Sequence, residues 1–231
     1  MSEVLVYALH GFLGSGADWD SVQNTLPENI HFKTESFFSS NFKSFNFRSL
    51  TTERKIFIGY SLGGRLGLKI LSQTPNEFDH YIFVSTHPGL ADEDLEARKQ
   101  RAALDRKWAE RITTENWSAF LTEWNAQDVF KGITLNPERS VGDYDIELLK
   151  QSLIGDSLAQ QPDYRQLIRQ NQDRLTWVVG SEDTKFKLIA DAMRDEGILQ
   201  NLTVLDSGHR ILSDNPHALA QIIMSVLPTR F

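Results

Sequence analysis

The sequence predicts an α/β protein built on a mostly parallel sheet flanked by helices, and three observations support this fold class. Short apolar runs without polar alternation recur along the chain, as in strands that are covered on both faces. Segments with helical spacing separate them, and this alternation is typical of a parallel sheet. The chain has 231 residues, 40% of them hydrophobic, so we expect a single domain over 1–231 with a substantial core.

The expected elements follow one another along the chain. The strands are the apolar runs at 4–9, 55–60, 80–85 and 175–180, and a fifth run at 202–208 that is more polar at its end. Helices are expected at 62–73, 185–197 and 215–227. The region from about 90 to 170 is charged, bears tryptophans and has helical spacing without a convincing strand. We expect it to be a helical lid, inserted before the strand at 175–180 and lying over the strands' carboxyl ends, where open α/β sheets place their active sites.

Composition excludes several classes of function. The formal charge of −7 and the absence of basic runs argue against nucleic acid or an anionic membrane as the main partner. Without cysteine there are no disulfides, thiolate nucleophiles or Cys-ligated metals. The N-terminal MSEVLVYALHGF lacks the basic start of a signal peptide, and no apolar stretch is long enough to span a bilayer. We therefore expect a cytoplasmic protein, either a monomer or a small homo-oligomer.

Residues 59–63, GYSLG, fit the pattern G-x-S-x-G at the junction of an expected strand and an expected helix. A serine on such a sharp turn is held in a strained conformation, while the glycines allow close approach of the backbone. The pattern alone is weak, and a glycine-rich turn with an incidental serine is the alternative. The strand and helix on either side favour Ser61 as the residue of a nucleophile elbow.

A serine hydroxyl needs a base, and the base needs an acid that orients it. Asp183 follows the fourth apolar run and His209 follows the fifth, so both lie at the same sheet edge as Ser61. The order Ser, Asp, His is that of α/β-hydrolases. Taken singly, Asp183 could be a helix N-cap and His209 an ordinary loop histidine. Glu182 is the rival acid.

Two backbone N–H groups are expected to form an oxyanion hole. Leu62 follows the serine, and Phe12 lies in the glycine-rich loop HGFLGSG after the first strand. The same loop could suggest a phosphate site, but no G-K-[ST] follows it.

Two arginines are candidates for binding an anion. Arg65 is four residues after Ser61 and shares its side of the helix, where a cation opposes the helix dipole unless a ligand anion offsets it. Arg101 lies on the apolar face of the first lid helix. It either pairs with a buried carboxylate, for which Asp105 is one turn away, or awaits a ligand. Trp124 belongs to a helical stripe of aromatic residues, and such stripes are more often core than ligand cage.

Six segments together resemble one branch of the α/β-hydrolases. They are HGFLGS, GYSLGGR, HPGL, the R-x-x-x-D-x-x-W-A pattern of the lid, GSEDTKF, and SGH followed by DNP. The branch comprises the 2-succinyl-6-hydroxy-2,4-cyclohexadiene-1-carboxylate (SHCHC) synthases of menaquinone biosynthesis, and the similarity covers most of the chain. GYSLGGR and the stretch from HPGL into the lid separate this branch from ordinary esterases.

The resemblance implies a carbon–oxygen lyase in which Ser61, Asp183 and His209 form the catalytic triad. Ser61, activated by His209, would remove a ring proton from 2-succinyl-5-enolpyruvyl-6-hydroxy-3-cyclohexene-1-carboxylate, and pyruvate would leave. The resemblance assigns Phe12 and Leu62 to the oxyanion hole. It implies no metal and no organic cofactor. The small substrate carries three carboxylates, and the resemblance gives these to Arg65 and Arg101 and places Tyr60 and Trp124 in the pocket.

The chain also departs from the family pattern. The tyrosine usual after Trp124 is Asn125, and a third lid arginine has a counterpart in Arg139 only with a shifted gap. The loop after the family's second strand corresponds to 35–47, which contains no glycine. Two alternatives to the lyase follow from the residues: a carboxylesterase or C–C bond hydrolase with Ser61 as covalent nucleophile, and a binding module that has lost catalysis.

Overall fold

The computed structural model describes residues 4–39, 41, 54–130 and 138–227. Within these ranges a sheet of six strands forms in the order β2-β1-β3-β4-β5-β6, and every neighbouring pair is parallel. The strands are β1 (Val4–Leu9), β2 (Ile30–Glu35), β3 (Arg54–Tyr60), β4 (His80–Val84), β5 (Leu175–Gly180) and β6 (Leu202–Leu205). The predicted fold class is confirmed.

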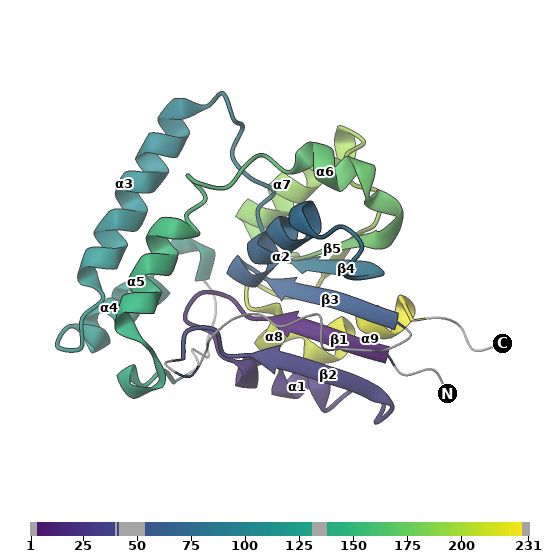
Figure 1. The fold of residues 1–231 in the computed structure, drawn as a ribbon, viewed down its shortest axis with the longest axis horizontal. Coiled ribbons are helices and arrows are strands. Elements are labelled where there is room, and N and C mark those ends of the chain that lie inside the picture. The colour runs from purple at the N-terminus through teal and green to yellow at the C-terminus, as the bar shows by residue number, and fades with distance from the viewer. Residues whose placement is uncertain (1–3, 40, 42–53, 131–137, 228–231) are drawn as a thin grey trace.

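Helices occupy most of the chain between the strands (Figure 1). They are α1 (Asp20–Gln23), α2 (Leu62–Gln73), α3 (Leu95–Arg111), α4 (Trp117–Asn125), α5 (Ile146–Gly155), α6 (Arg165–Gln170), α7 (Thr184–Asp195), α8 (Ile211–Asp214) and α9 (Pro216–Ser225). Short 3-10 turns lie at Gly16–Trp19, Asp128–Phe130, Val141–Asp143 and Gln172–Arg174. The predicted helix after Ser61 therefore has the expected bounds.

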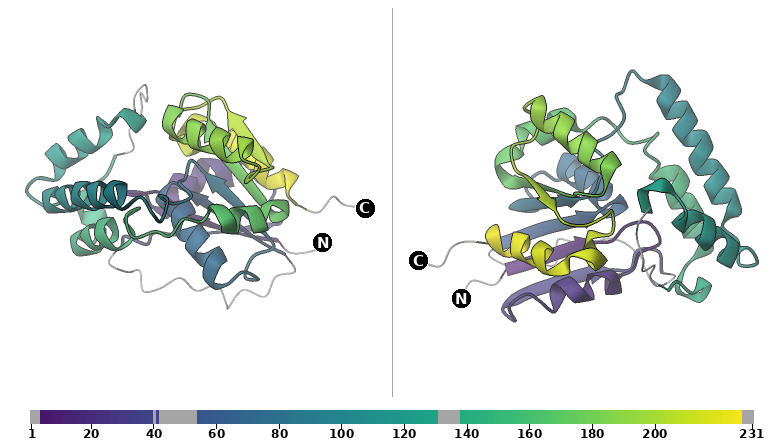
Figure 2. Two further views of the ribbon diagram at one scale, coloured as in Figure 1. Left: turned by 90° about the horizontal axis from the view of Figure 1, so that it is seen from above. Right: turned by 180° about the vertical axis from the view of Figure 1, so that it is seen from behind.

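Both faces of the sheet are covered, which explains why its strands read as continuous apolar runs. Tyr7 and Phe57 belong to the core on the face that carries α2, α6 and α7. Their neighbours Val6 and Ile58 belong to the core on the opposite face, under α1, α8 and α9. The view from behind in Figure 2 shows α1 and α9 beside each other on that second face. Side chains alternate between the faces with the strand period of two.

Side-chain caps fix where three of the helices begin. The carboxylates of Asp94 and Asp145 accept hydrogen bonds from backbone N–H groups in the first turns of α3 and α5, each at 3.0 Å. Asn215 caps α9 in the same way, and Pro216 fills its first helical position. Such caps satisfy N–H groups that have no acceptor within the helix.

Helices α3, α4 and α5, together called the helical block, lie beyond the carboxyl ends of the strands (Figures 1 and 2). Helix α3 packs against α5, and Trp117 and Phe120 of α4 are buried between them and the loops. The two ends of the described chain lie at the opposite side of the sheet (Figure 1). The helical block thus borders the edge at which an α/β sheet presents its site residues.

Two features of the fold differ from expectation. No apolar run predicted β2, whose residues are mostly half-exposed because it is the edge strand beside β1. The fifth strand is expected to extend to Gly208, but β6 ends at Leu205, and residues 206–208 leave the strand there.

Most of the glycine-free stretch at 35–47 lies outside the described residues. No helix in the described ranges has the length and apolar character needed to cross a bilayer.

Candidate active site

Ser61 occupies the sharp turn between β3 and α2. Its φ of 52° and ψ of −109° place a non-glycine residue in a conformation that side chains disfavour, and its N–H donates to the Val84 carbonyl at 2.8 Å. Gly63, in the first turn of α2, lies so close to β1 that a Cβ there would meet the Leu9 carbonyl oxygen at 2.2 Å. This close packing holds Ser61 at the end of the strand, with its hydroxyl toward the site.

His209 lies between Ser61 and Asp183. Its Nε2 is 3.3 Å from Ser61 Oγ, and its Nδ1 is 2.7 Å from Asp183 Oδ2. Both His209 and Asp183 are 3% exposed. Asp183 is the N-cap residue of α7 but makes no side-chain capping bond, because its carboxylate is turned to the imidazole. Glu182, the rival acid, is exposed. The structure thus brings the three predicted side chains together in triad order.

Aromatic rings surround the imidazole of His209. Ring centroids of Phe186, Tyr60 and Phe130 lie 4.7, 5.5 and 5.7 Å from it. Burial raises the pKa of the Tyr60 hydroxyl, so this side chain remains neutral. The apolar enclosure restricts water near the imidazole and strengthens its hydrogen bond to Asp183.

The two expected oxyanion donors belong to residues that line the same cavity as Ser61. Leu62 is the first residue of α2, so its N–H has no acceptor within the helix. Phe12 lies in a turn after β1 that is closed by a 3.0 Å hydrogen bond from Gly14 N to the Gly11 carbonyl. His10 fixes the same turn: its Nδ1 is 2.7 Å from the Gly11 oxygen, and its ring stacks on Phe37. Burial lowers the pKa of His10 to about 4, which keeps this imidazole neutral.

A cavity of about 370 Å³, called the main pocket, opens on one side of Ser61. Tyr60, Trp124, Asn125, Arg139 and Arg210 are among its lining residues. Arg139 forms a bidentate ion pair with Asp18, both contacts at 2.8 Å. Burial disfavours the charge of Arg139, but the Asp18 carboxylate raises its pKa overall. Arg210 donates to Asn125 Oδ1 at 2.6 Å and stacks on Phe130.

A second cavity of about 110 Å³, called the side pocket, meets the main pocket at Ser61, Phe12 and Trp124. Its lining includes Arg65, Arg101 and Leu62. Arg65 donates to the Asp156 backbone carbonyl, and burial, followed by repulsion from Arg101, lowers its pKa to about 10. Both predicted arginines therefore border the space beside the serine.

Arg101 makes the carboxylate contact that the sequence left open. Its Nε donates to Asp105 Oδ2 at 2.8 Å, one helical turn away. Asp105 is 2% exposed and also accepts from Ser157 Oγ at 2.6 Å. Arg101 keeps 29% of its side chain exposed and lines the side pocket. It is thus both paired and accessible to a ligand.

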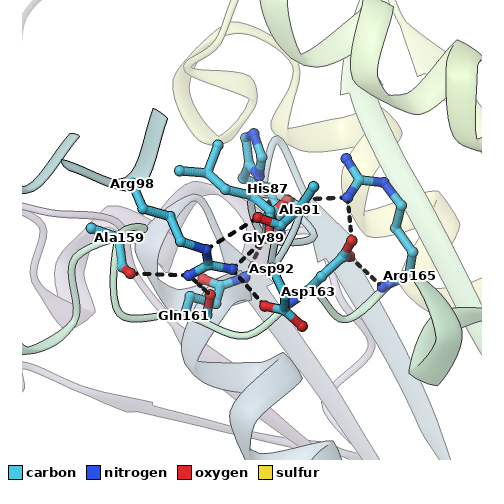
Figure 3. Close-up of polar contacts among 10 residues, drawn as sticks. His87, Gly89, Ala91, Asp92, Arg98, Ala159, Gln161, Asp163 and Arg165 are labelled. Carbon is cyan, nitrogen blue, oxygen red and sulfur yellow. Dashed lines mark hydrogen bonds and ion pairs between the residues drawn. The ribbon is translucent and has the colours of Figure 1, made fainter. Parts of the chain in front are cut away.

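Arg98 joins the two chain crossings between the sheet and the helical block (Figure 3). Its guanidinium donates to the Leu90 and Ala91 carbonyls and to Asp92 on the outgoing crossing. It also donates to the Ala159 and Gln161 carbonyls on the returning one. These bonds fix the start of α3, and α3 is the helix that carries Arg101.

Sequence reasoning missed several residues of the site. Asp18 is far in sequence from its partner Arg139, and no spacing rule relates them. Lys185 and His87 line the side pocket, and in the sequence they stand inside the motifs GSEDTKF and HPGL. A cation in the first turn of a helix, the unusual placement noted at Arg65, would also have singled out Lys185. Across the described ranges, no group of three or more acidic or histidine side chains could hold a metal ion.

Comparisons with known proteins place the chain among curated relatives. A 2-succinyl-6-hydroxy-2,4-cyclohexadiene-1-carboxylate synthase of Klebsiella pneumoniae (strain 342) is 30% identical over 240 residues, covering 94% of this chain and 92% of the relative. The synthase of the same name from Enterobacter sp. (strain 638) is 28% identical over 249 residues, covering 96% and 91%. No family model matches the chain.

Among solved structures, MenH from S. aureus superposes with a TM-score of 0.81 at 18% identity, covering 97% of this chain and 93% of that one. At this identity the match shows the fold. It agrees with the parallel sheet and flanking helices described above.

Proposed function

Because the chain belongs to the family of 2-succinyl-6-hydroxy-2,4-cyclohexadiene-1-carboxylate synthases, we propose that Ser61, His209 and Asp183 carry out the elimination that this family name describes. The protein is a carbon–oxygen lyase of menaquinone biosynthesis and acts on a small substrate. The observation that carries this conclusion is 30% identity to a named synthase over 94% of the chain. The esterase alternative is not favoured by these relatives.

The reaction converts 2-succinyl-5-enolpyruvyl-6-hydroxy-3-cyclohexene-1-carboxylate to the 2,4-cyclohexadiene and pyruvate. A base removes the proton at ring carbon 2, and that electron pair forms the double bond between carbons 2 and 3. The former double bond between carbons 3 and 4 moves to carbons 4 and 5, and the bond from carbon 5 to oxygen breaks. The departing enolpyruvate takes up one proton at its methylene carbon and becomes pyruvate, so protons and electrons balance.

Ser61 acts as the base in this proposal. Its hydroxyl accepts the ring proton as it gives its own to His209 Nε2, and Asp183 stabilises the imidazolium through Nδ1. The distance of 3.3 Å between Ser61 Oγ and His209 Nε2 is long for a hydrogen bond, and such catalytic bonds tighten when substrate binds. Deprotonation at carbon 2 places negative charge on the adjacent succinyl ketone, and the N–H groups of Phe12 and Leu62 are the donors that stabilise it.

Four side chains bind the substrate in this proposal. Arg65 and Arg101 face carboxylates of the substrate, while Tyr60 and Trp124 form walls beside the serine. Their support is their place at the two pockets that meet there. Arg139, on the main-pocket wall, fits the third arginine of the family pattern only with a shifted gap.

We further propose that the helical block, within residues 90–170, is a lid over a single domain spanning 1–231. Its support is the position of α3, α4 and α5 beyond the strands' carboxyl ends (Figure 1). We also propose that the protein works in the cytoplasm, as a monomer or small homo-oligomer.

Pyruvate release tests the function directly. The protein is incubated with the enolpyruvyl substrate, and pyruvate is followed through lactate dehydrogenase and NADH absorbance. We expect release far above the spontaneous rate. Pyruvate release at only the spontaneous rate would reject the lyase. If the protein also gave a burst of nitrophenol from a nitrophenyl ester and a covalent adduct at Ser61, the hydrolase would be the correct assignment.

A further inference from the structure

The side pocket holds more positive charge than its own residues neutralise. Arg65, Arg101 and Lys185 line it together with one carboxylate, that of Asp105. Arg65 donates to a backbone carbonyl, and Asp105 divides its acceptor capacity between Arg101 and Ser157. A ligand anion would supply the missing negative charge.

Lys185 is the third of these cations. It lies in the first turn of α7, where the helix dipole opposes a positive charge, and it follows Asp183 by two residues. No carboxylate in the described part of the chain lies within ion-pair distance of its ammonium group, whereas Lys187 on the same helix pairs with Asp191 at 2.6 Å. Its aliphatic stem instead brings the ammonium to within 5.6 Å of the Phe186 ring centroid. Lys185 is therefore free to contact a ligand in the pocket.

His87 adds a neutral donor to the same wall. Its Nδ1 accepts a hydrogen bond from Gly89 N at 3.1 Å, so the neutral ring carries its proton on Nε2. Burial, together with the cations Lys185, Arg165, Arg65 and Arg101, lowers the pKa of His87 to about 3. The ring consequently offers an N–H at neutral pH without adding to the charge.

Hydrogen bonds connect the backbone around His87 to the returning crossing (Figure 3). Gly89 has a φ of 123°, and a Cβ there would meet the Pro162 carbonyl oxygen at 2.2 Å. The His87 carbonyl accepts from Gln161 Nε2 at 3.0 Å, while the Gln161 carbonyl accepts from Arg98. This network holds the imidazole in one orientation at the pocket wall.

The chemistry of the proposed reaction indicates which part of the substrate enters the side pocket. The ketone that becomes negatively charged carries a two-carbon chain ending in a carboxylate, the succinyl arm. Phe12 and Leu62, the proposed donors to that ketone, both line the side pocket, and of the two only Phe12 also lines the main pocket. A ketone bound by both donors thus lies at the mouth of the side pocket. The ring and its leaving group remain on the larger side.

We propose that the side pocket is the subsite for the succinyl carboxylate, and that Lys185 and His87 are ligands of that carboxylate beside Arg65 and Arg101. This assignment rests on the proposed function, because only that substrate makes the occupant of the side pocket a succinyl arm. It distinguishes this carboxylate from the two carried by the ring and the enolpyruvyl group, which face the main pocket.

Equilibrium binding of 4-oxo-4-phenylbutanoate tests the subsite, because this probe carries the succinyl arm on a ring with no second carboxylate. We expect NMR titration to show binding about tenfold weaker for Lys185→Gln than for wild type. The matched control Lys187→Gln, whose lysine pairs with Asp191, should bind as wild type does. Butyrophenone, which has the ring and the ketone but no carboxylate, should bind wild type and Lys185→Gln equally.

Two variants separate the donor role of His87 from its role in the turn. His87→Asn retains an oxygen that can accept from Gly89 N–H but removes the Nε2 donor, so binding of the probe should weaken about fivefold. His87→Gln, whose amide reaches the Nε2 position, should recover most of the loss. With the enolpyruvyl substrate the same changes should raise KM and leave kcat nearly unchanged, as for an interaction made equally in ground and transition states.

Failure of the subsite and failure of the function give different results. Wild-type-like probe affinity in both Lys185→Gln and His87→Asn would overturn the subsite even if pyruvate is released normally. Loss of butyrophenone and probe binding in equal measure would overturn it too, because the loss would then not depend on the carboxylate of the arm. Absence of pyruvate release with a Lys185-dependent probe affinity would reject the lyase while supporting the anion site.

Discussion

The main pocket and the side pocket share Ser61, but they neutralise their cations differently. In the main pocket, Arg139 is held by both oxygens of Asp18. In the side pocket, Arg65 donates to the backbone carbonyl of Asp156, and Lys185 has no carboxylate partner within the described residues. An ion pair orders an arginine before the ligand binds. A cation without a carboxylate partner is neutralised only when an anionic ligand binds. The difference implies that the main-pocket arginine is already neutralised within the protein, whereas the side pocket still needs the negative charge of a ligand.

The largest expected effect is at the wall that both pockets share. Ser61→Ala should lower kcat for pyruvate release about 10³- to 10⁴-fold, because it removes the proposed base and leaves both pockets in place. Affinity for the cyclohexadiene product should change little. Activity within tenfold of wild type would show that the serine is not the base, and an unchanged unfolding temperature is the control for folding.

Removing a side-pocket cation should have the next largest effect. Arg65→Ala should reduce kcat/KM about 10- to 100-fold, equivalent to about 1.5–3 kcal/mol for a lost charge-assisted contact. The free energy of unfolding should fall little, because the partner of Arg65 is a backbone carbonyl, that of Asp156, and not a buried carboxylate. Steady-state kinetics and thermal unfolding measured on the same preparation would decide the point.

Arg101→Ala sharpens this result within the same pocket. Its kinetic loss should resemble that of Arg65→Ala, but the free energy of unfolding should also fall, by about 1–3 kcal/mol. The reason is that Asp105, 2% exposed, would keep only Ser157 as a partner. Equal stability of the two variants would contradict the distinction between a paired and an unpaired arginine.

The ion pair of the main pocket should appear chiefly in stability. A double-mutant cycle with Asp18→Asn and Arg139→Met should give a coupling of about 1–3 kcal/mol in urea unfolding, since both side chains are about 85% buried, with 16% and 15% exposed. For Arg139→Met we expect a smaller loss in kcat/KM than for Arg65→Ala. The reverse order of kinetic losses, with no measurable coupling, would remove the contrast between the pockets.

The smallest effect is expected at Asn125, where the family pattern has tyrosine. Asn125→Ala removes an acceptor of Arg210, whose guanidinium keeps its stacking on Phe130 at 4.5 Å. We expect kcat/KM to fall less than about threefold, roughly the contribution of one partly exposed hydrogen bond. A larger fall would mean that the position of Arg210, which Asn125 helps to fix, matters directly for substrate binding in the main pocket.

Parts of the fold that depend on local chemistry were predictable from sequence. Unbroken apolar runs predict the buried strands. A serine between glycines at the end of such a run predicts the nucleophile elbow. Strand β2 could not be found in this way, because an edge strand needs only one buried side chain, Ile30, and otherwise looks polar. The sequence also predicts strand for residues 206–208, because no local signal marks the residue at which pairing with the neighbouring strand ends.

The candidate site shows the same limit. Asp183 and His209 were predictable because parallel strands deliver their ends to one edge. Whether Arg101 pairs with Asp105 was not, because a spacing of four residues is compatible with pairing and with freedom. The pairing of Arg139 with Asp18 joins residues 121 positions apart and depends on how the segment between α4 and α5 meets the loop after β1. Contacts of this kind are set by tertiary packing alone.

A crystal structure of Ser61→Ala with the enolpyruvyl substrate tests the central claim most directly, since without its base the enzyme should hold the substrate intact. The account predicts the succinyl ketone oxygen within hydrogen-bond distance of the Phe12 and Leu62 N–H groups, the arm's carboxylate against Lys185 and Arg65, and ring carbon 2 facing residue 61. A succinyl arm lying against Arg139, or a ring whose carbon 2 faces away from residue 61, would contradict it.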